Sequence, residues 1–324
     1  MNALRSILRR YRFLARSFVI PVVFLLVSGS GCGAVRRAEV RGMAELFTKP
    51  PGSDVFLQDD DPELIREALP FALKTFEVLL ASDPENRDLC QVTAEAFVTY
   101  AHAFVFDEAE RMEALDFKRA QVLQKRAEKL YLRGRDYAFQ GLSLDHPNFE
   151  KRLRNDPENA LKSLSQRDVP LVYWAAAGWA GAISSDRGNM SLVAELPVAV
   201  AMMRRCLELD EDFGDGMIHE FFITYEGSRS EAMGGSAQRA REHFVRAVNL
   251  TGEQKAWPYV ALASSVAVRK QDYKMFNNLL EKALAVDPDA VPKWRLSNIL
   301  AQEKAKWLLD HGADLFIDYS EDKS

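Results

Sequence analysis

A helix ending that recurs along the chain constrains its fold more than any other feature. Five helical patterns close on an aspartate or threonine, often with a proline next to it, at residues 81–84, 143–147, 208–211, 249–252 and 285–288. Proline disfavours helix at the residue before it and starts the next helix well, because its ring fixes φ and its missing N–H is not needed there. The pattern predicts a series of helices separated by short turns.

Small and apolar residues stand at fixed distances before each ending. The sets are Ala72/Phe76, Gly134/Ala138, Ala199/Met203/Cys206, Ala240/Phe244/Ala247 and Phe276/Leu280/Ala283. This spacing is half of a tetratricopeptide (TPR) unit, in which a small residue lets two helices approach and a larger one fills the gap. The endings lie 62, 65, 41 and 36 residues apart instead of about 34, so the repeat is irregular. We predict an all-α fold of degenerate TPR-like helical repeats, an α-solenoid or helical bundle with inserted helices, and such folds usually bind partners.

The first 31 residues have the composition of an export signal. Five arginines without an acid precede an unbroken apolar run at 18–27, and the small residues 28–31 follow. The run is too short for an ordinary spanning helix. Cys32 comes next, and the arrangement resembles a bacterial lipoprotein signal, in which the cysteine carries palmitate-type acyl chains; Gly29 departs from that pattern. A plain secretory signal cut nearby and a twin-arginine signal at Arg9-Arg10 are the alternatives.

The sequence divides into four parts. We expect a signal at 1–31, a tether at 32–60, a TPR-like helical domain at 61–312 and a C-terminal tail at 313–324. The domain begins with Asp61 as N-cap and Pro62 in the first helical position. A long charged helix is predicted at 109–140.

Charge and cysteine content narrow the classes of function. Without residues 1–31 the chain keeps 37 lysines and arginines against 47 acids, so a nucleic-acid partner is not expected. Cys206 occupies the small-residue position of a repeat, which favours a buried thiol over a disulfide with Cys90. Neither cysteine lies in a CxxC or Cys/His cluster, so no metal site is predicted.

No catalytic motif stands out, and we do not expect an enzyme or a cofactor. His219-Glu220 lacks the second histidine of HExxH, and no Gly-Lys-Ser/Thr follows the loop glycines at 214–216 and 234–235. His102 and His243 lie on helical patterns, where packing or surface roles are more common than ligation. A helical lyase or hydrolase is the alternative, which a pocket holding His, Glu and Arg would favour.

Two aromatic segments could bind a ligand or a partner. The first combines three aromatic residues with two glycines, Tyr173, Trp174, Trp179, Gly178 and Gly181. Such residues can wall an apolar channel, and a central buried helix is the alternative. The second lies between glycine loops and contains Phe221, Phe222 and Tyr225. If these segments bind, Trp174→Ala or Phe222→Ala should weaken binding and leave melting near normal.

Longer blocks of sequence resemble one family. The blocks are residues 59–74 (DDDPELIREALPFALK), 131–138 (YLRGRDYA), 168–174 (DVPLVYW), 233–240 (MGGSAQRA) and 295–305 (RLSNILAQEKA). Together they resemble the TatT family, the periplasmic T component of tetratricopeptide-associated TRAP transporters. The resemblance implies a homotrimeric, membrane-tethered lipoprotein with a pore through each subunit and no catalytic residues. It also implies a partnership with the extracytoplasmic solute-binding P component.

These features predict a periplasmic lipoprotein that docks a TRAP solute-binding protein and assists uptake of a small organic ligand. The class of ligand includes hydrophobic molecules. The candidate ligand, pore or partner-binding residues are Tyr173, Trp174, Trp179, Phe221, Phe222, Tyr225 and Asn298. Gly33 after Cys32 is not aspartate, which by the usual sorting rule favours the outer membrane. The alternative is a general envelope scaffold lipoprotein without a transporter partner.

Overall fold

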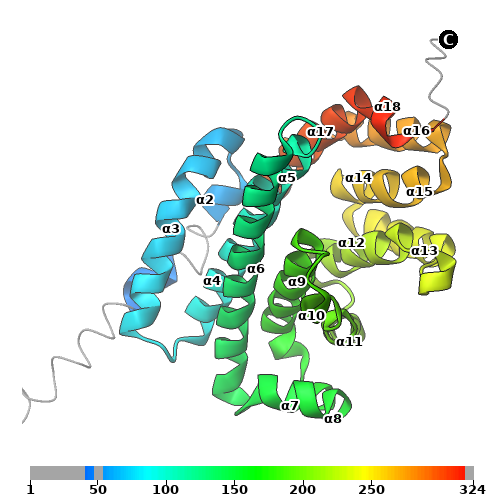
Figure 1. Ribbon diagram of the computed structural model, residues 1–324. Coiled ribbons are helices and arrows are strands. Elements are labelled where there is room, and N and C mark those ends of the chain that lie inside the picture. Colours follow the sequence, from blue (N-terminus) through cyan, green and yellow to red (C-terminus); the bar gives the residue numbers. More distant parts are fainter. Residues whose placement is uncertain (1–40, 47–53, 318–324) are drawn as a thin grey trace, which may run out of the picture.

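The computed structural model describes residues 41–46 and 54–317, and this part of the chain consists of helices and turns without a strand (Figure 1). The N-terminal helices are α2 (Asp54–Leu57), α3 (Pro62–Ser82), α4 (Arg87–Tyr100), α5 (Asp107–Met112), α6 (Phe117–Asp145), α7 (Phe149–Asn155), α8 (Pro157–Lys162), α9 (Val169–Ser185), α10 (Met190–Val193) and α11 (Leu196–Leu209). The C-terminal helices are α12 (Phe213–Ser228), α13 (Ala237–Thr251), α14 (Trp257–Leu262), α15 (Val268–Lys270), α16 (Tyr273–Ala285), α17 (Arg295–Asp310) and α18 (Gly312–Leu315). The predicted all-α helical class is confirmed.

Two π-helical turns join neighbouring helices into longer ones. The turn Ala101–Phe106 joins α4 to α5, and the turn Ala263–Ala267 joins α14 to α15. Within the described residues, one helix, Arg87–Met112, is apolar and long enough to cross a membrane by length and composition alone. More than half of its apolar stretch is buried inside the protein, as expected of a core helix.

The sequence predicted the start of α3 correctly and the course of α6 incorrectly. Asp61 caps α3, because its Oδ1 accepts hydrogen bonds from the backbone N–H groups of Glu63 (3.1 Å) and Leu64 (3.0 Å). The single long helix predicted at 109–140 does not exist, since the chain leaves α5 after Met112 and α6 runs on to Asp145. The physical reason is Asp116, whose carboxylate accepts the backbone N–H of Arg119 at 3.0 Å and so starts a new helix.

Six helices close into a ring, which we call the inner ring. Helix α3 packs on α4, α4 on α9, α9 on α12, α12 on α14, α14 on α17, and α17 returns to α3. Helices α6, α11, α13 and α16 pack against this ring (Figure 1). Two polar contacts support the closure: Arg295 donates to the Gln58 carbonyl at 3.1 Å, and Lys304 Nζ lies 2.9 Å from Asp107. The repeats therefore close on themselves instead of forming an open superhelix.

Two buried clusters of side chains share α12. Ile218 and Phe222 belong to the larger cluster, which is built mainly from α4, α6, α9 and α11. Ile223 belongs to the second cluster, which is built from α13, α14, α16 and α17. Because consecutive residues of one helix serve both clusters, the two halves of the ring form a continuous body.

Glycines bring α6 and α9 unusually close. A Cβ on Gly178 would lie 2.8 Å from the backbone oxygen of Tyr131, and one on Gly181 would lie 2.4 Å from the ring of Tyr131. A Cβ on Gly134 would lie 2.7 Å from the side chain of Val98. We call the close contact that Gly178 and Gly181 make between α9 and α6 the glycine seam, whereas Gly134 brings α6 close to α4.

Described residues on both sides of the predicted 61–312 domain also pack on it. Ala44 is buried in a cluster with Phe76 and Cys90, and Phe316 packs on the rings of Tyr273 (5.3 Å) and Phe276 (5.0 Å). The predicted signal at 1–31, Cys32 and residues 318–324 lie outside the described residues.

Candidate functional site inside the helical ring

A polar row runs along one face of α4 and its π-helical extension. Glu95, Thr99 and His102 stand at positions i, i+4 and i+7, so they share a face of the continuous helix. Most positions around them are apolar and buried. Thr99 and His102 are nevertheless exposed, and Glu95 is only partly buried. Water-sized space therefore reaches this face of a core helix.

The neighbours of His102 show that this face is turned toward the inside of the ring. Its Nδ1 lies 3.2 Å from the Tyr131 hydroxyl on α6, and its ring centre lies 5.9 Å from that of Trp257 on α14. Burial lowers the pKa of His102, and charges on three further elements act on it as well, from Glu110 and Asp107 of α5, Lys304 of α17 and Glu220 of α12. His102 is thus surrounded by helices and still accessible. It also lies in a π-helical turn, a distortion that is frequent at functional sites.

Glu95 provides the carboxyl group of the row. Burial raises its pKa to about 7, and a hydrogen bond from the side chain of Trp174 on α9 acts in the opposite direction. Its charge also acts on the hydroxyl of Tyr173, whose own pKa is raised strongly by burial. Glu95 therefore exchanges a proton near neutral pH. We define the interior face as the six residues Glu95, Thr99, His102, Tyr173, Trp174 and Trp257.

The cations near the interior face already have partners. Lys255 Nζ lies 2.7 Å from the carboxylate of Glu220. Lys304 Nζ lies 2.9 Å from Asp107 and 2.9 Å from Glu110. Neither lysine is among the groups that act on Glu95, so the described residues supply that carboxyl with no cationic partner.

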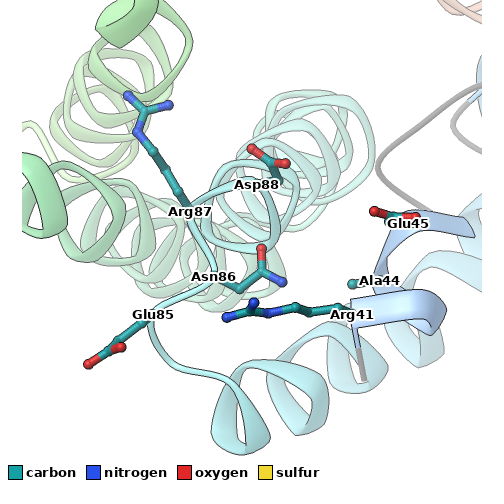
Figure 2. Close-up of a pocket in the computed structure, with 7 residues that line it drawn as sticks. All are labelled: Arg41, Ala44, Glu45, Glu85, Asn86, Arg87 and Asp88. Carbon is teal, nitrogen blue, oxygen red and sulfur yellow. The ribbon is translucent and has the colours of Figure 1, made fainter. Parts of the chain in front are cut away.

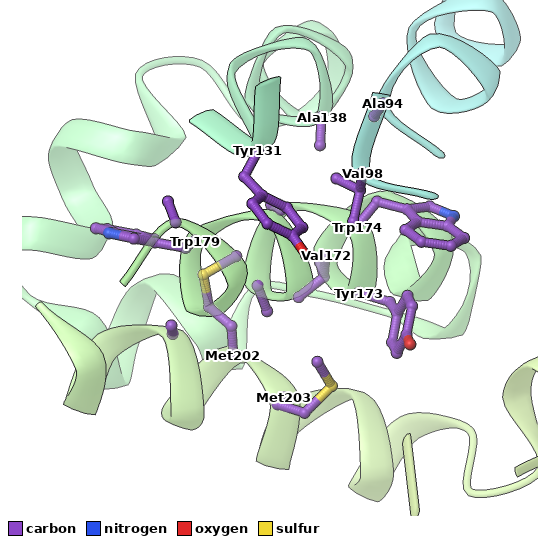
Figure 3. Packing of buried hydrophobic residues seen from close by; sticks show 14 of the residues in the cluster. Ala94, Val98, Tyr131, Ala138, Val172, Tyr173, Trp174, Trp179, Met202 and Met203 are labelled. Atoms are coloured by element: carbon purple, nitrogen blue, oxygen red, sulfur yellow. The ribbon is translucent and has the colours of Figure 1, made fainter. Parts of the chain in front are cut away.

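The aromatic segment predicted on α9 divides between two sides of the helix. Tyr173 and Trp174 lie together, with ring centres 5.0 Å apart, and Tyr173 also contacts Phe213 at 5.2 Å. Trp179 lies at the other end of the cluster in Figure 3, fully buried, and its Nε1 donates to Glu195 at 2.9 Å. Tyr173 and Trp174 are both buried and form the aromatic part of the interior face, whereas Trp179 belongs to the outer packing of α9.

The three aromatic residues predicted on α12 form one cluster, with ring centres 5.3, 5.9 and 6.2 Å apart, but they differ in burial. Phe222 is buried and stacks on His243 of α13 with ring centres 4.9 Å apart. Phe221 is half-buried and stacks on Tyr225 at 5.9 Å, and the Arg229 guanidinium covers the Tyr225 ring at 4.1 Å. The structure therefore brings these three predicted residues together, with Phe222 turned to the packing against α13 while Phe221 and Tyr225 keep accessible surface.

Both the oxygen and the nitrogen of the Asn298 side-chain amide form hydrogen bonds to the backbone. Its Oδ1 accepts the backbone N–H of Ala256 at 3.0 Å, and its Nδ2 donates to the carbonyl of Gln254 at 2.9 Å. The side chain is fully buried. These bonds tie α17 to the turn that leads into α14, and they thereby hold Trp257 in place.

The prediction from sequence omitted half of the interior face. Glu95, Thr99 and Trp257 were not among the candidates, and His102 was interpreted as a packing or surface residue. The polar row of α4 did carry a signal, because three polar residues at helical spacing interrupt an otherwise apolar face. Trp257 carried none, since only closure of the ring brings α14 to α4.

A pocket of about 260 Å³ lies at the start of α4, away from the interior face (Figure 2). It is lined by Arg41, Ala44, Glu45, Glu85, Asn86, Arg87 and Asp88. Both arginines are engaged in ion pairs, Arg41 with Asp83 at 2.9 Å and Arg87 with Asp168 at 2.9 Å. Figure 2 shows Arg87 turned away from Arg41. We therefore favour the interior face as the candidate site.

The remaining reactive groups are engaged in packing. Cys90 and Cys206 are free and buried, as the sequence indicated, and burial raises the pKa of Cys90 to about 12. His219 and His243 join α12 to α13 with their Nδ1 atoms 2.8 Å apart, and burial lowers the pKa of His219 to about 4. Within the described part of the chain, no group of three or more His, Cys, Asp or Glu residues is placed to hold a metal ion.

Comparisons with known proteins place this architecture in a family. A sequence model of the TRAP transporter T-component family (TAtT) matches residues 58–316, a range that contains the whole inner ring. An uncharacterized protein of Treponema pallidum (strain Nichols) is 28% identical over 268 residues, which cover 82% of this chain and 83% of that protein. The chain therefore belongs to the TRAP transporter T-component family, the accessory, membrane-associated periplasmic components of bacterial TRAP transporters.

Proposed function

We propose that this protein docks a TRAP solute-binding protein and passes a small organic ligand through the interior of its ring. The observation that carries this proposal is the interior face, where accessible polar side chains and the half-buried Trp257 lie with the buried rings of Tyr173 and Trp174 inside a closed ring of helices. Ligand sites are typically concave and largely apolar, with a few polar groups that fix orientation. Membership of the T-component family supplies the transporter context.

The candidate residues take different parts in this proposal. Tyr173 and Trp174 contact the ligand, and Phe221 and Tyr225, which are half-buried, border the route to the docked partner. Trp179, Phe222 and Asn298 hold the frame of the ring, because each is buried and engaged with another helix or loop. Conveying a ligand needs no bond to break, so the proposal includes no catalytic role.

The anchor in this proposal is Cys32. The small residues 28–31 directly before it support lipidation. Each buried methylene adds about 0.8 kcal/mol, so several acyl chains would hold the protein on a membrane permanently. Outer-membrane location and a homotrimeric assembly belong to the same proposal, the first because Gly33 follows the cysteine and the second because of the family resemblance.

Sedimentation of a reconstituted complex tests the proposal. The lipid-free body, residues 33–324, is mixed with the solute-binding protein encoded beside it, and a solute-binding protein from an unrelated TRAP system serves as the control. We expect a stoichiometric complex on a trimeric core with the neighbouring protein alone. A monomer that forms no complex at tens of micromolar would instead support the alternative, an envelope scaffold without a transporter partner.

A further inference from the structure

The unpaired carboxyl of Glu95 indicates what the interior accepts. The side chain belongs to a core helix and keeps accessible surface, and its described neighbours include a hydrogen-bonding indole but no cation. A buried carboxylate without a cationic partner is costly in a protein, and a ligand can supply the missing charge. Lys255 and Lys304 do not do so, because each forms an ion pair with another carboxylate.

Two aromatic rings adjoin Glu95, and a third lies further along the interior face. Trp174, whose side chain lies near enough to lower the pKa of Glu95, packs edge-on against Tyr173 at an interplanar angle of 82°. Trp257 lies across the interior beside His102. Faces of Trp and Tyr rings attract cations, and organic ammonium groups are commonly bound between such rings and a carboxylate. An anionic ligand would instead meet the negative charge of Glu95, which no lysine or arginine of the described residues neutralises.

We propose that the interior face binds a small organic cation, a protonated or quaternary amine, with the Glu95 carboxylate as its counter-ion and Trp174 and Tyr173 as the adjoining aromatic walls. This inference rests on the proposed function, because it assigns a class of ligand to the same interior. Binding requires no covalent step. The ammonium group approaches the carboxylate, and its apolar substituents replace water against the rings.

Three probes of the same shape and different charge test the assignment. Choline is cationic, 3,3-dimethylbutan-1-ol is its neutral isostere, and 3,3-dimethylbutanoate is anionic. Binding to the full-length protein, purified in a non-ionic detergent, is measured by tryptophan fluorescence and calorimetry at pH 8. We expect choline to bind at least about tenfold more tightly than the alcohol, and the anion most weakly. Equal affinities, a preference for the anion, or no binding of choline at about 10 mM would overturn the assignment.

Substitutions connect the preference to Glu95. Glu95→Gln keeps the size of the side chain and should remove the advantage of choline over the alcohol, while Glu95→Asp should retain part of it. Glu158→Gln removes one charge from an exposed position on α8 and serves as the control, with no expected change. Thermal melting of each variant shows that it is folded. If Glu95→Gln binds choline as well as the unchanged protein does, the assignment is wrong.

The pH dependence of choline affinity is an independent test of Glu95, because choline keeps its charge at every pH. Affinity should rise by about tenfold between pH 6 and pH 8, as Glu95 ionises, and should stay flat in Glu95→Gln. The other titratable groups facing this region are Tyr173, His102 and Glu220, with Asp107, Glu110 and Lys304 beyond them. Burial lowers the pKa of His102, so less of its titration falls in this range, and the Glu95→Gln variant, which keeps His102, separates the contribution of Glu95 from that of the histidine.

The two proposals can fail separately. Docking of the solute-binding protein is measured by sedimentation with the Glu95→Gln variant, and it should be unchanged, because Glu95 lies inside the ring. Choline binding without docking would retain the cation site and remove the transporter role. Docking without a preference for choline would retain the transporter role and remove the cation site.

Discussion

Two helices of the inner ring, α9 and α12, each have a packed side and an open side. The two sides differ in how tightly their residues contact other helices. On α9, the glycine seam and Trp179 contact other helices without space for water, whereas Tyr173 and Trp174 adjoin the accessible carboxyl of Glu95. On α12, Phe222 is buried against His243, whereas Phe221 on the adjoining position is half-buried.

The difference shows how one helix can serve stability and function at once. The packed side holds apolar groups and satisfied hydrogen bonds, so substitutions there should act on the free energy of unfolding. The open side adjoins accessible groups with shifted pKa values, such as Glu95, so substitutions there should act on charge, on pH dependence and on binding. The predictions below test this division, beginning with the largest effect.

Phe222→Ala should cost the most stability. Truncating a buried phenylalanine removes contacts and leaves a cavity, at a cost of about 3–5 kcal/mol in the free energy of unfolding. Phe221→Ala is the matched control on the open side of the same helix and should cost less than half as much. Urea unfolding measures both, and equal costs would contradict the division of α12 into two sides.

Gly178→Ala tests the glycine seam. Its methyl group would press on the backbone of α6, which cannot move aside as a side chain can, and we expect a loss of about 1–3 kcal/mol. Gly188→Ala is the control, since its nearest contact would be the Asp186 carboxylate at 3.5 Å, and it should stay within about 0.5 kcal/mol. A stabilised Gly178→Ala protein would show that the seam is looser than its geometry indicates.

Sequence reasoning recovered the helices more fully than the site, and α3 and α6 show why. The cap of α3 depends on residues adjacent in sequence, Asp61 and Pro62, so local chemistry was enough to place it. The break before α6 was equally local, but the charged sequence on both sides is compatible with helix and concealed Asp116 as a cap. Local signals therefore predicted most elements and failed where two helix-forming segments adjoin.

The site depends on contacts between residues far apart in the chain. Trp174 and Trp179 stand five positions apart in one apolar segment, and composition could not show that one faces the interior and the other the outer packing. That distinction comes from α6, which covers one side of α9. Closure of the ring by α17 is likewise a contact between both ends of the domain, which no local pattern predicts.

Glu95→Gln should change stability in a pH-dependent way. The pKa of Glu95 is raised in the folded protein to about 7, so its burial costs nothing at pH values where both states are protonated and becomes destabilising as pH rises through the folded pKa. Gln carries no such cost. We expect the variant to gain on the order of 1–2 kcal/mol over the unchanged protein at pH 8 and to match it near pH 4.5, as measured by thermal melting. A constant difference across this range would mean that Glu95 titrates normally.

His102→Gln should change the free energy of unfolding least. It tests whether the inner side of α4 faces open space. His102 is accessible and its neighbour Tyr131 can turn to water or to the new amide, so the free energy of unfolding should change by less than about 0.5 kcal/mol at pH 8. Because the folded protein lowers the pKa of His102, the unchanged protein loses stability as pH falls below the ordinary histidine value, and the variant should lose slightly less.

His219→Gln is the comparison on the packed side. That histidine is buried and bonded to His243, and the pKa of about 4 makes it a larger contributor to the loss of stability in acid. Its replacement should destabilise the protein at pH 8, because it breaks the contact between α12 and α13. If His102→Gln proves as destabilising as His219→Gln, then His102 is packed like its counterpart, and the inner side of α4 does not face open space.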